Sequence, residues 1–321
     1  MGNAFICRRG GGGSTFRGLT VVSQPNKTSY LPGQYIDMTG AVIGADFGNF
    51  VVPIDYTGLY SPTRALTASD TAITVTATYG NITKSVQIPI TVTNVSTTFG
   101  NNTWEMIAYI SSLGEANNFW SIGDSKIENG ITYTIIGMSH DFLSSTDAKY
   151  RDSSYNRNTK KAGLTIQVMT AAGPAVMNET ATNIGGWDEC YMRNTVMPAY
   201  LAGMSSDIRA VMRTVDKTTS IGGYNTTAMT TSRDQLFLLA ASEMKSPVNT
   251  VVLLSEIDAN PIYAYYANGE AAYKGVAEWS RSPHKPQYCN EECHFVAYTN
   301  ANLFLETDAN TSYSYFPAFC I

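Results

Sequence analysis

The chain has 321 residues, enough for two domains, and only 15% of them are charged, with a formal net charge of −5 at pH 7. Soluble domains usually carry about 25% charged residues, so this surface must be made largely of neutral polar and aromatic side chains, including 20 tyrosines. The sequence has no basic block and no apolar run near the roughly 18 residues that span a bilayer. We therefore expect neither nucleic-acid binding nor membrane insertion, and the tyrosine content favours a strand-rich display protein.

Residues 1–19 have the composition of a flexible docking arm. Four consecutive glycines, at 10–13, carry too much backbone freedom to form a helix or strand alone. The candidate docking residues around them are Phe5, Ile6, Arg8, Arg9, Phe16 and Arg17. The alternative is a passive tail. The opening MGNAFICRRGGGG looks like the N-terminus of many bacteriophage virion proteins, which implies that the arm docks onto other virion proteins.

Residues 20–95 alternate polar and apolar side chains in the manner of short antiparallel strands. The strand-like segments are, in order, 35–39, 41–43, 72–79 and 83–92. Turn residues at short spacing between such strands indicate a β-sandwich. The region resembles bacterial immunoglobulin-like domains in the stretches PNKTSYLPGQYIDMTGAVI, YSPTRALTASDTAITVTATYG and IPITVT. The resemblance implies a spacer or assembly surface with no chemistry of its own.

A polar stretch at 94–102 predicts a linker, and the residues after it mix helical and strand patterns. Thr103 is placed to cap a helix over 104–110, whose apolar residues recur at helical spacing. A second helix is expected over 197–211, with Pro198 in its first turn. Strands are expected at 131–138, 164–168, 236–239 and 295–298. This pattern predicts an α+β domain over residues 96–321.

Several short motifs follow one another in this second region. In order, they are GGW leading into YMR (185–193), DQLFLL (234–239), WSRSP (279–283), FVA (295–297) and YFPAFCI (315–321). Together they resemble C-type-lectin-like domains of bacterial and bacteriophage surface proteins. The resemblance implies that the WSRSP and PAFCI strands pack side by side and that Trp187, Trp279 and Phe319 share one core. The whole chain is thus expected to be mostly β, with an immunoglobulin-like β-sandwich followed by an α+β C-type-lectin-like domain.

Two long segments of the second region are the candidate binding loops, because such folds place recognition on loops rather than on the scaffold. The segment 147–161 offers aromatic rings and guanidinium groups suited to stacking on sugars and bonding their hydroxyls, from Tyr150, Arg151, Tyr155 and Arg157. The segment 260–274 offers a tyrosine cluster, made of Tyr263, Tyr265, Tyr266 and Tyr273. The cluster could equally pack against a neighbouring subunit, so a homo-oligomer is also expected.

Four residues near the end of the chain have the ligand types of a zinc site: Cys289, Cys293, His294 and His284. A disulfide between the two cysteines and an inert pair of thiols are the alternatives. The odd total of five cysteines is not a disulfide framework and suits folding in a reducing compartment. We therefore predict no resident metal or other cofactor.

Catalytic patterns are weak in this sequence. Neighbouring residues His140 and Asp141 have the types of a general base pair, but adjacent residues on a strand point to opposite faces. Alternating oxygen-bearing residues at Glu256, Asp258 and Asn260 could bind a hard cation, although a solvated turn is the preferred interpretation. The sequence contains no GxSxG, P-loop, dinucleotide-binding glycine set or HExxH motif. We predict that the protein is not an enzyme.

Three functions follow from these observations. The first is a structural component of a bacteriophage virion, in the tail, neck or head decoration, whose lectin-like domain presents loops to a bacterial surface glycan or protein. The second is a purely architectural virion protein with no receptor. The third is an enzyme, because formylglycine-generating enzymes share the lectin-like fold and use paired cysteines. The N-terminus has no apolar segment of about 7–15 residues for export, which favours assembly in the host cytoplasm into a virion.

Overall fold

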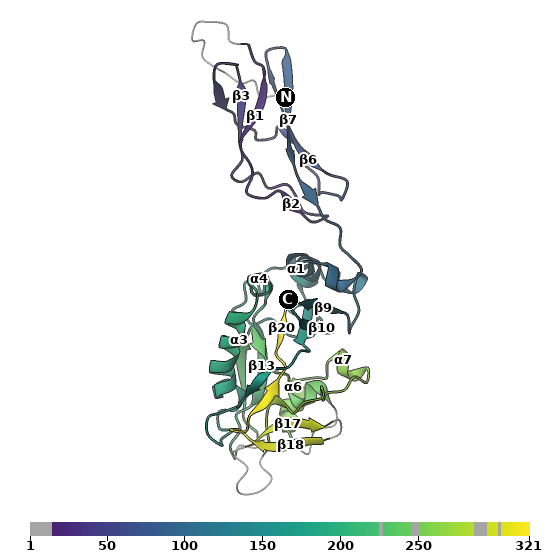
Figure 1. The fold of residues 1–321 in the computed structure, drawn as a ribbon, viewed down its shortest axis with the longest axis vertical. Coiled ribbons are helices and arrows are strands. Elements are labelled where there is room, and N and C mark those ends of the chain that lie inside the picture. Colours follow the sequence, from purple (N-terminus) through teal and green to yellow (C-terminus); the bar gives the residue numbers. More distant parts are fainter. Residues whose placement is uncertain (1–14, 225–226, 246–250, 286–293, 301–302) are drawn as a thin grey trace. The chain divides into compact units, whose positions relative to one another are not determined.

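The structure is a computed structural model, and it describes residues 15–224, 227–245, 251–285, 294–300 and 303–321 (Figure 1). The chain divides into two compact units, Met1–Val95 and Ser96–Ile321. Strands make up 34% of the chain and helices 20%, so the prediction of a mostly-β protein is confirmed. Each unit is described below by itself.

Unit 1 is built from strands alone in its described part. The strands are β1 (Gly18–Ser23), β2 (Ser29–Tyr30), β3 (Val42–Asp46), β4 (Val51–Pro53), β5 (Tyr60–Ser61), β6 (Ala72–Tyr79), β7 (Ile82–Pro89) and β8 (Thr91–Val92). They form two three-stranded sheets, in the orders β1-β3-β4 and β5-β6-β7, and a parallel pair of β2 with β8. The β6–β7 hairpin matches the predicted strand at 72–79 and most of the one at 83–92, and Gly80 turns the chain between them with a φ of 60°. The end of the second predicted strand is instead β8, which pairs with β2.

The core of unit 1 is apolar. Ile43, Ile73, Val75 and Ile88 are fully buried in one cluster to which both three-stranded sheets contribute. Period-two alternation explains this, because alternate residues of each strand face the same side of the sheet. Two sheets around one apolar core are the layers of a β-sandwich.

Two expectations for unit 1 were wrong. Phe16 is 4% exposed and packs against Phe47 and Tyr79, so it belongs to the core rather than to a docking arm. The backbone of Arg17 also lies in the unit, since its N–H donates to the Asp46 carbonyl at 2.8 Å, but its side chain is exposed and its docking role stays a prediction. Phe5, Ile6, Arg8 and Arg9 lie outside the described residues.

The predicted strand at 35–39 is instead an irregular loop. The Tyr30 hydroxyl accepts a hydrogen bond from the Asp37 N–H at 3.1 Å, and the Asp37 carboxylate accepts one from the Thr39 N–H at 2.9 Å. These side chains satisfy backbone groups that a neighbouring strand would otherwise have to satisfy.

Unit 2 mixes strands with short helices. Its strands are β9 (Ser125–Glu128), β10 (Ile131–Met138), β11 (Leu164–Val168), β12 (Ala172–Ala175), β13 (Val215–Ser220), β14 (Met229–Asp234), β15 (Leu236–Phe237), β16 (Glu278–Pro283), β17 (His294–Asn300), β18 (Leu303–Asp308), β19 (Tyr313–Tyr315) and β20 (Ala318–Cys320). Its helices are α1 (Trp104–Ser112), α2 (Gly186–Glu189), α3 (Met197–Gly203), α4 (Ser206–Val211), α5 (Ala241–Met244), α6 (Leu254–Ala259) and α7 (Ala264–Ala267). Shorter helical turns are η1 (Phe99–Asn101), η2 (Ala116–Asn118), η3 (Tyr155–Asn158) and the π-turn η4 (Met192–Val196).

Three sheets organise unit 2. One has the strand order β15-β20-β11-β10-β9, a second has β12-β19-β16-β17-β18, and β13 and β14 form a separate antiparallel pair. The predicted helix at Thr103 is confirmed, because the Thr103 side chain accepts the Met106 N–H at the start of α1. The predicted strands 131–138 and 164–168 coincide with β10 and β11.

Two predictions for unit 2 were wrong. The WSRSP strand (β16) and the PAFCI strand (β20) are not paired: β16 pairs with β17 and β19, whereas β20 pairs with β11 and β15. The single helix expected over 197–211 is two helices, since Met204 is extended and the Ser205 hydroxyl caps a new helix by accepting the Ile208 N–H. Serine competes for backbone donors in this way, which favours a new helix start over continuation.

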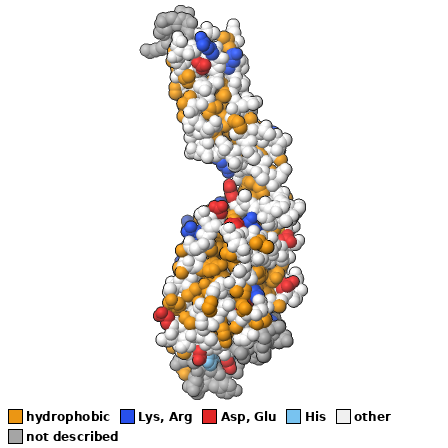
Figure 2. Space-filling view, in the orientation of Figure 1, with side chains coloured by type: hydrophobic (Ala, Val, Ile, Leu, Met, Phe, Trp, Pro, Cys, Tyr) orange, Lys and Arg blue, Asp and Glu red, His pale blue; other side chains and the backbone are white. Residues whose placement is uncertain are grey.

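The three large side chains expected in the core, Trp187, Trp279 and Phe319, are all 2% exposed or less. Each indole N–H has an acceptor, the Asp234 carboxylate for Trp187 and the Ala175 carbonyl for Trp279. The visible face of unit 2 carries few and scattered charged side chains, as the composition predicts (Figure 2). Within the described residues, no helix has the length and apolar character to span a bilayer.

Candidate functional site

The segment that follows β10 brings acidic and basic side chains to the centre of unit 2. Ser139 has a φ of 47°, a left-handed conformation that ends the strand alternation. His140, Asp141 and Glu243 each place one ligand-type atom within 4.8 Å of the others. The expectation that His140 and Asp141 point to opposite faces was therefore wrong, because they lie beyond the last residue of the strand.

Five buried residues form what we call the Asp141 cluster: Asp141, Lys217, Glu243, Tyr263 and Arg281, each no more than 5% exposed. The Lys217 ammonium donates to Asp141, to Glu243 Oε1 at 3.2 Å and to the Tyr263 hydroxyl at 2.9 Å. The Tyr263 hydroxyl lies 2.9 and 3.0 Å from the two oxygens of Asp141. Lys217 also lies 4.0 Å above the ring of Phe237, so apolar and aromatic groups enclose its charge.

The second half of the cluster is a two-pronged ion pair. Arg281 donates through Nη1 to Glu243 Oε2 at 2.5 Å and through Nη2 to Oε1 at 3.1 Å. The same guanidinium donates to the Leu238 carbonyl at 2.9 Å and to Asn260 Oδ1 at 2.6 Å. Two acids and two bases thus cancel in charge. Buried charges are tolerated only when they are paired and hydrogen-bonded in this way.

The ionisable groups of the Asp141 cluster do not change their protonation state near neutral pH. Burial alone would raise the pKa of Asp141, but the Lys217 ammonium and the His140 ring hold it well below its usual range. Burial opposes the charge on Lys217, yet Asp141 and Glu243 raise its pKa above the ordinary value. Burial raises the pKa of Tyr263 far above its usual range. Lys217 already bonds Asp141 and Glu243, which are two of the three residues with metal-ligand atoms. Its ammonium group therefore stands beside these carboxylates where a metal ion would otherwise have to lie.

An open cavity of about 470 Å³ lies against this cluster. We call it the Asp216 pocket and define it by six of its lining residues: His140, Phe142, Lys161, Asp216, Thr218 and Thr231. Its volume falls within the range of about 300–1,000 Å³ that is typical of small-molecule sites. The β13–β14 hairpin forms one wall, where Thr218 lies opposite Thr231 with their hydroxyls 2.9 Å apart.

The Asp216 pocket combines an aromatic surface with an unused acceptor. Phe142 is 59% exposed, and the Lys161 ammonium lies 4.7 Å from its ring centroid. Asp216 Oδ1 is buried and has no hydrogen-bond partner among the described residues. A buried acceptor without a partner costs about 1–3 kcal/mol, and the Asp216 side chain as a whole is only half-buried, so the residue still faces the pocket. His140 stacks on Tyr263 with centroids 4.0 Å apart, which couples the pocket wall to the cluster.

The first predicted binding loop, 147–161, is only partly available to a ligand. Tyr155 is 4% exposed and burial raises its pKa to about 12, so its prediction as a contact residue was wrong. Arg157 is exposed but pairs with Glu115 at 2.5 Å, and Arg151 is exposed. Tyr150 is half-buried beneath the Lys160 ammonium.

The second predicted loop, 260–274, contains α7, and two of its four tyrosines face inward. Tyr263 belongs to the Asp141 cluster, and the Tyr266 hydroxyl bonds the buried side chain of Gln167, so both were wrongly predicted as surface contacts. Tyr265 and Tyr273 are half-buried. The loop is anchored because these phenols find polar partners inside the unit.

The predicted metal ligands are only partly described, since Cys289 and Cys293 lie outside the described residues. His284 Nε2 lies 2.9 Å from Glu306 Oε2, and His294 Nε2 lies 3.0 Å from Asp308 Oδ1. The two imidazole rings are 6.4 Å apart between centroids. Each histidine thus directs a nitrogen at its own carboxylate.

The expected solvated turn at 256–260 was also wrong. Glu256 is fully buried in α6 and accepts the Ser220 N–H at 2.7 Å, while Asn260 is buried and donates to the Thr218 carbonyl at 2.8 Å. Burial raises the pKa of Glu256 to about 7. Glu256 is therefore an interior residue whose hydrogen bond joins α6 to β13.

Apart from His140 and Lys161, which ends the predicted loop 147–161, sequence reasoning missed the residues that define the Asp216 pocket. The signal was the segment Val215–Ser220, where an acid and a base stand next to each other in a strand-like stretch. Charged neighbours on one strand require partners on both faces of the sheet. No family model matches this sequence, and no curated protein matches it.

Proposed function

We propose that this chain is a structural display protein of a bacteriophage virion, and that unit 2 binds a carbohydrate of the bacterial surface in the Asp216 pocket. The single observation that carries the binding proposal is that one cavity is lined both by the exposed ring of Phe142 and by the half-buried carboxylate of Asp216, whose Oδ1 has no hydrogen-bond partner among the described residues. A pyranose has an apolar face that packs on an aromatic ring and hydroxyls that donate to a carboxylate. The virion assignment rests on the sequence resemblances described above.

We interpret the Asp141 cluster as a rigid support behind this pocket and not as a site of acid–base chemistry. Its carboxylates already accept hydrogen bonds from Lys217, Arg281 and Tyr263. Binding sites gain affinity when their groups are held in place before the ligand arrives. The cluster fixes β13, α5 and β16 against one another, and β13 carries Asp216 and Thr218.

The test is a titration of the full chain with polysaccharides released from the host cell surface, followed by calorimetry with the saccharide that binds. We expect Asp216→Asn and Phe142→Ala each to weaken binding at least tenfold while the thermal midpoint changes little. Asp258→Asn is the matched control, because Asp258 is an exposed acid outside the pocket lining. If the wild-type chain binds no host saccharide but still joins the particle, the purely architectural function replaces this one.

A further inference from the structure

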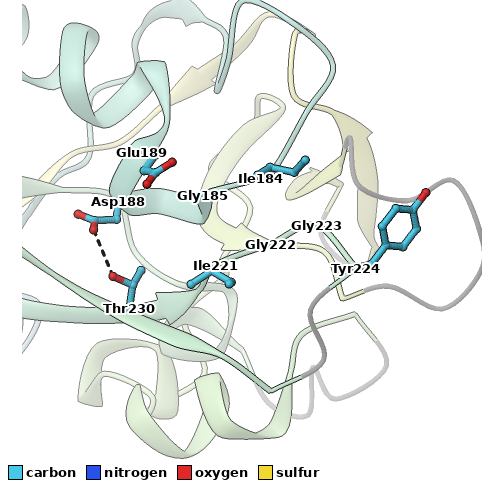
Figure 3. Close-up of a pocket in the computed structure, with 9 residues that line it drawn as sticks. All are labelled: Ile184, Gly185, Asp188, Glu189, Ile221, Gly222, Gly223, Tyr224 and Thr230. Atoms are coloured by element: carbon cyan, nitrogen blue, oxygen red, sulfur yellow. Dashed lines mark hydrogen bonds between the residues drawn. The ribbon is translucent and has the colours of Figure 1, made fainter.

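A second cavity of unit 2, of about 430 Å³, lies between two glycine turns far apart in the sequence. We call it the Gly185 slot and define it by Gly185, Asp188, Glu189, Ile221, Gly222 and Thr230 (Figure 3). A Cβ on Gly186 would overlap the Ser220 carbonyl, and one on Gly222 would overlap the Asn183 carbonyl. The Gly223 N–H donates to Asn183 Oδ1 at 2.7 Å. Close backbone packing therefore holds the two turns together.

The two ends of the Gly185 slot differ in chemistry. The carboxylates of Asp188 and Glu189 lie at one end, and Ile184 and Tyr224 lie toward the other (Figure 3). Ile184 and Tyr224 are each 57% exposed, so both present apolar surface to solvent at this end of the slot. A complementary partner would carry apolar groups next to cationic ones.

The acidic end has capacity for an added cation. Asp188 is shared between Arg193, whose Nη1 lies 3.2 Å from its Oδ1, and the Thr230 hydroxyl at 3.1 Å. Glu189 is exposed and has no cation within ion-pair distance among the described residues. A guanidinium matches such a carboxylate well, because it donates two parallel hydrogen bonds.

The N-terminal segment of this chain, residues 1–14, has the matching order of groups. Phe5 and Ile6 are followed after one residue by Arg8 and Arg9, and then by four glycines. The segment has two positive side chains and no acidic one. Fourteen residues can extend over about 45 Å, which is enough to reach a neighbouring molecule.

We propose that the Gly185 slot of one molecule receives residues 1–14 of a second copy of this chain. Phe5 and Ile6 contact Ile184 and Tyr224, and an arginine of the Arg8-Arg9 pair bonds Glu189. The contact joins different surfaces of the two copies, so it is heterologous and repeats along an assembly. It is independent of the Asp216 pocket, which is formed by other residues of unit 2.

The first test is a charge reversal across the contact, read by sedimentation of the full chain under reducing conditions that prevent disulfides at Cys7. We expect concentration-dependent self-association that Glu189→Arg weakens at least tenfold and that Arg8→Glu with Arg9→Glu weakens equally. All three changes combined should restore association to within about threefold of wild type. Glu179→Arg, which changes an exposed acid outside the slot, is the control and should leave association unchanged.

The second test identifies the occupant. A photo-crosslinking residue at position 5 should attach to residues 184–189 or 221–224, and a mixture of isotope-labelled and unlabelled chains should show that the link joins two molecules. A free peptide of residues 1–14 should abolish it in competition. The proposal is overturned if the chain is a monomer at all concentrations or if the crosslink joins two parts of one chain. It is also overturned if the combined charge-reversal variant stays folded but does not regain self-association.

Discussion

Unit 1 and unit 2 are both strand-rich, yet the side chains that fill their interiors differ in kind. No charged side chain is buried in the described part of unit 1, where isoleucine, valine and phenylalanine fill the space between the sheets. Unit 2 buries Asp141, Lys217, Glu243 and Arg281 together. Apolar packing is non-directional, whereas a buried ion pair is tolerated in only one arrangement of partners. The interior of unit 1 therefore constrains its side chains mainly by shape, whereas the interior of unit 2 also fixes which groups must meet.

The largest effect should come from removing one member of the cluster. We expect Arg281→Met to lower the free energy of unfolding of unit 2 by about 3–5 kcal/mol, because Glu243 then stays buried without its guanidinium. Chemical denaturation followed by tryptophan fluorescence measures this, since all four tryptophans lie in unit 2. Replacing Glu243 by Met as well should recover part of the loss. A single variant as stable as wild type would mean that the cluster is not needed for stability.

Truncating a buried apolar side chain in unit 1 should lower the free energy of unfolding slightly less, and the loss should be confined to that unit. Ile73→Ala removes buried methyl groups between the sheets, and we expect a loss of about 2–4 kcal/mol confined to unit 1. Scanning calorimetry of the full chain should show one transition shifting and the other unchanged. Simultaneous loss of both transitions would contradict the independence of the two units.

The third prediction concerns the pH dependence of unit 2. Burial raises the pKa of Glu256 from an ordinary 4.5 to about 7, so the folded state binds a proton more tightly than the unfolded state. Its contribution to stability is full below about pH 4.5 and is lost as the pH rises through about 7. We expect Glu256→Gln to be about 2–3 kcal/mol more stable than wild type at pH 8, with little difference at pH 5. Denaturant midpoints at the two pH values measure this, with Asp258→Asn as the exposed control on the same helix. Equal effects at both pH values would be inconsistent with titration of Glu256.

The smallest effect is expected at the start of α1. Thr103→Ala removes the hydroxyl that accepts the Met106 N–H at 3.2 Å and should destabilise unit 2 by about 1 kcal/mol. Thr103→Ser, which keeps the hydroxyl, should restore most of this loss. If the alanine and serine variants have the same denaturant midpoint, the cap contributes nothing.

The parts of the fold that were predicted correctly depend on local patterns. The β6–β7 hairpin, α1, β10 and β11 each follow from the periodicity of a few consecutive residues and from one turn or cap. The pairing of β16 and β20 was wrong because a strand's neighbours depend on contacts distant in sequence. Such contacts leave no local periodicity.

The candidate site could be predicted less well for a related reason. Arg281 lies in a strand whose residues are all buried, whereas Lys217 lies between the half-buried Asp216 and Thr218. The burial of both depends on partners that the sequence separates widely. Tyrosine is ambiguous as well, because Tyr263 and Tyr266 bury their phenols while Tyr265 stays half-exposed. The signal that could have been used was the pair Asp216 and Lys217, an acid and a base next to each other in a strand-like stretch.

The wide separation within the Asp141 cluster has a consequence for the order of folding. Asp141 bonds Lys217, which lies 76 residues further along the chain, and Tyr263, which lies 122 residues further along. Contacts of such separation slow folding, because long loops must close before any ion pair forms. During synthesis, unit 1 can fold as soon as its strands leave the ribosome, whereas the cluster cannot be complete until Arg281 has also emerged. We expect a nascent chain of unit 2 to expose Lys217 and Glu243 to water until the last strands arrive.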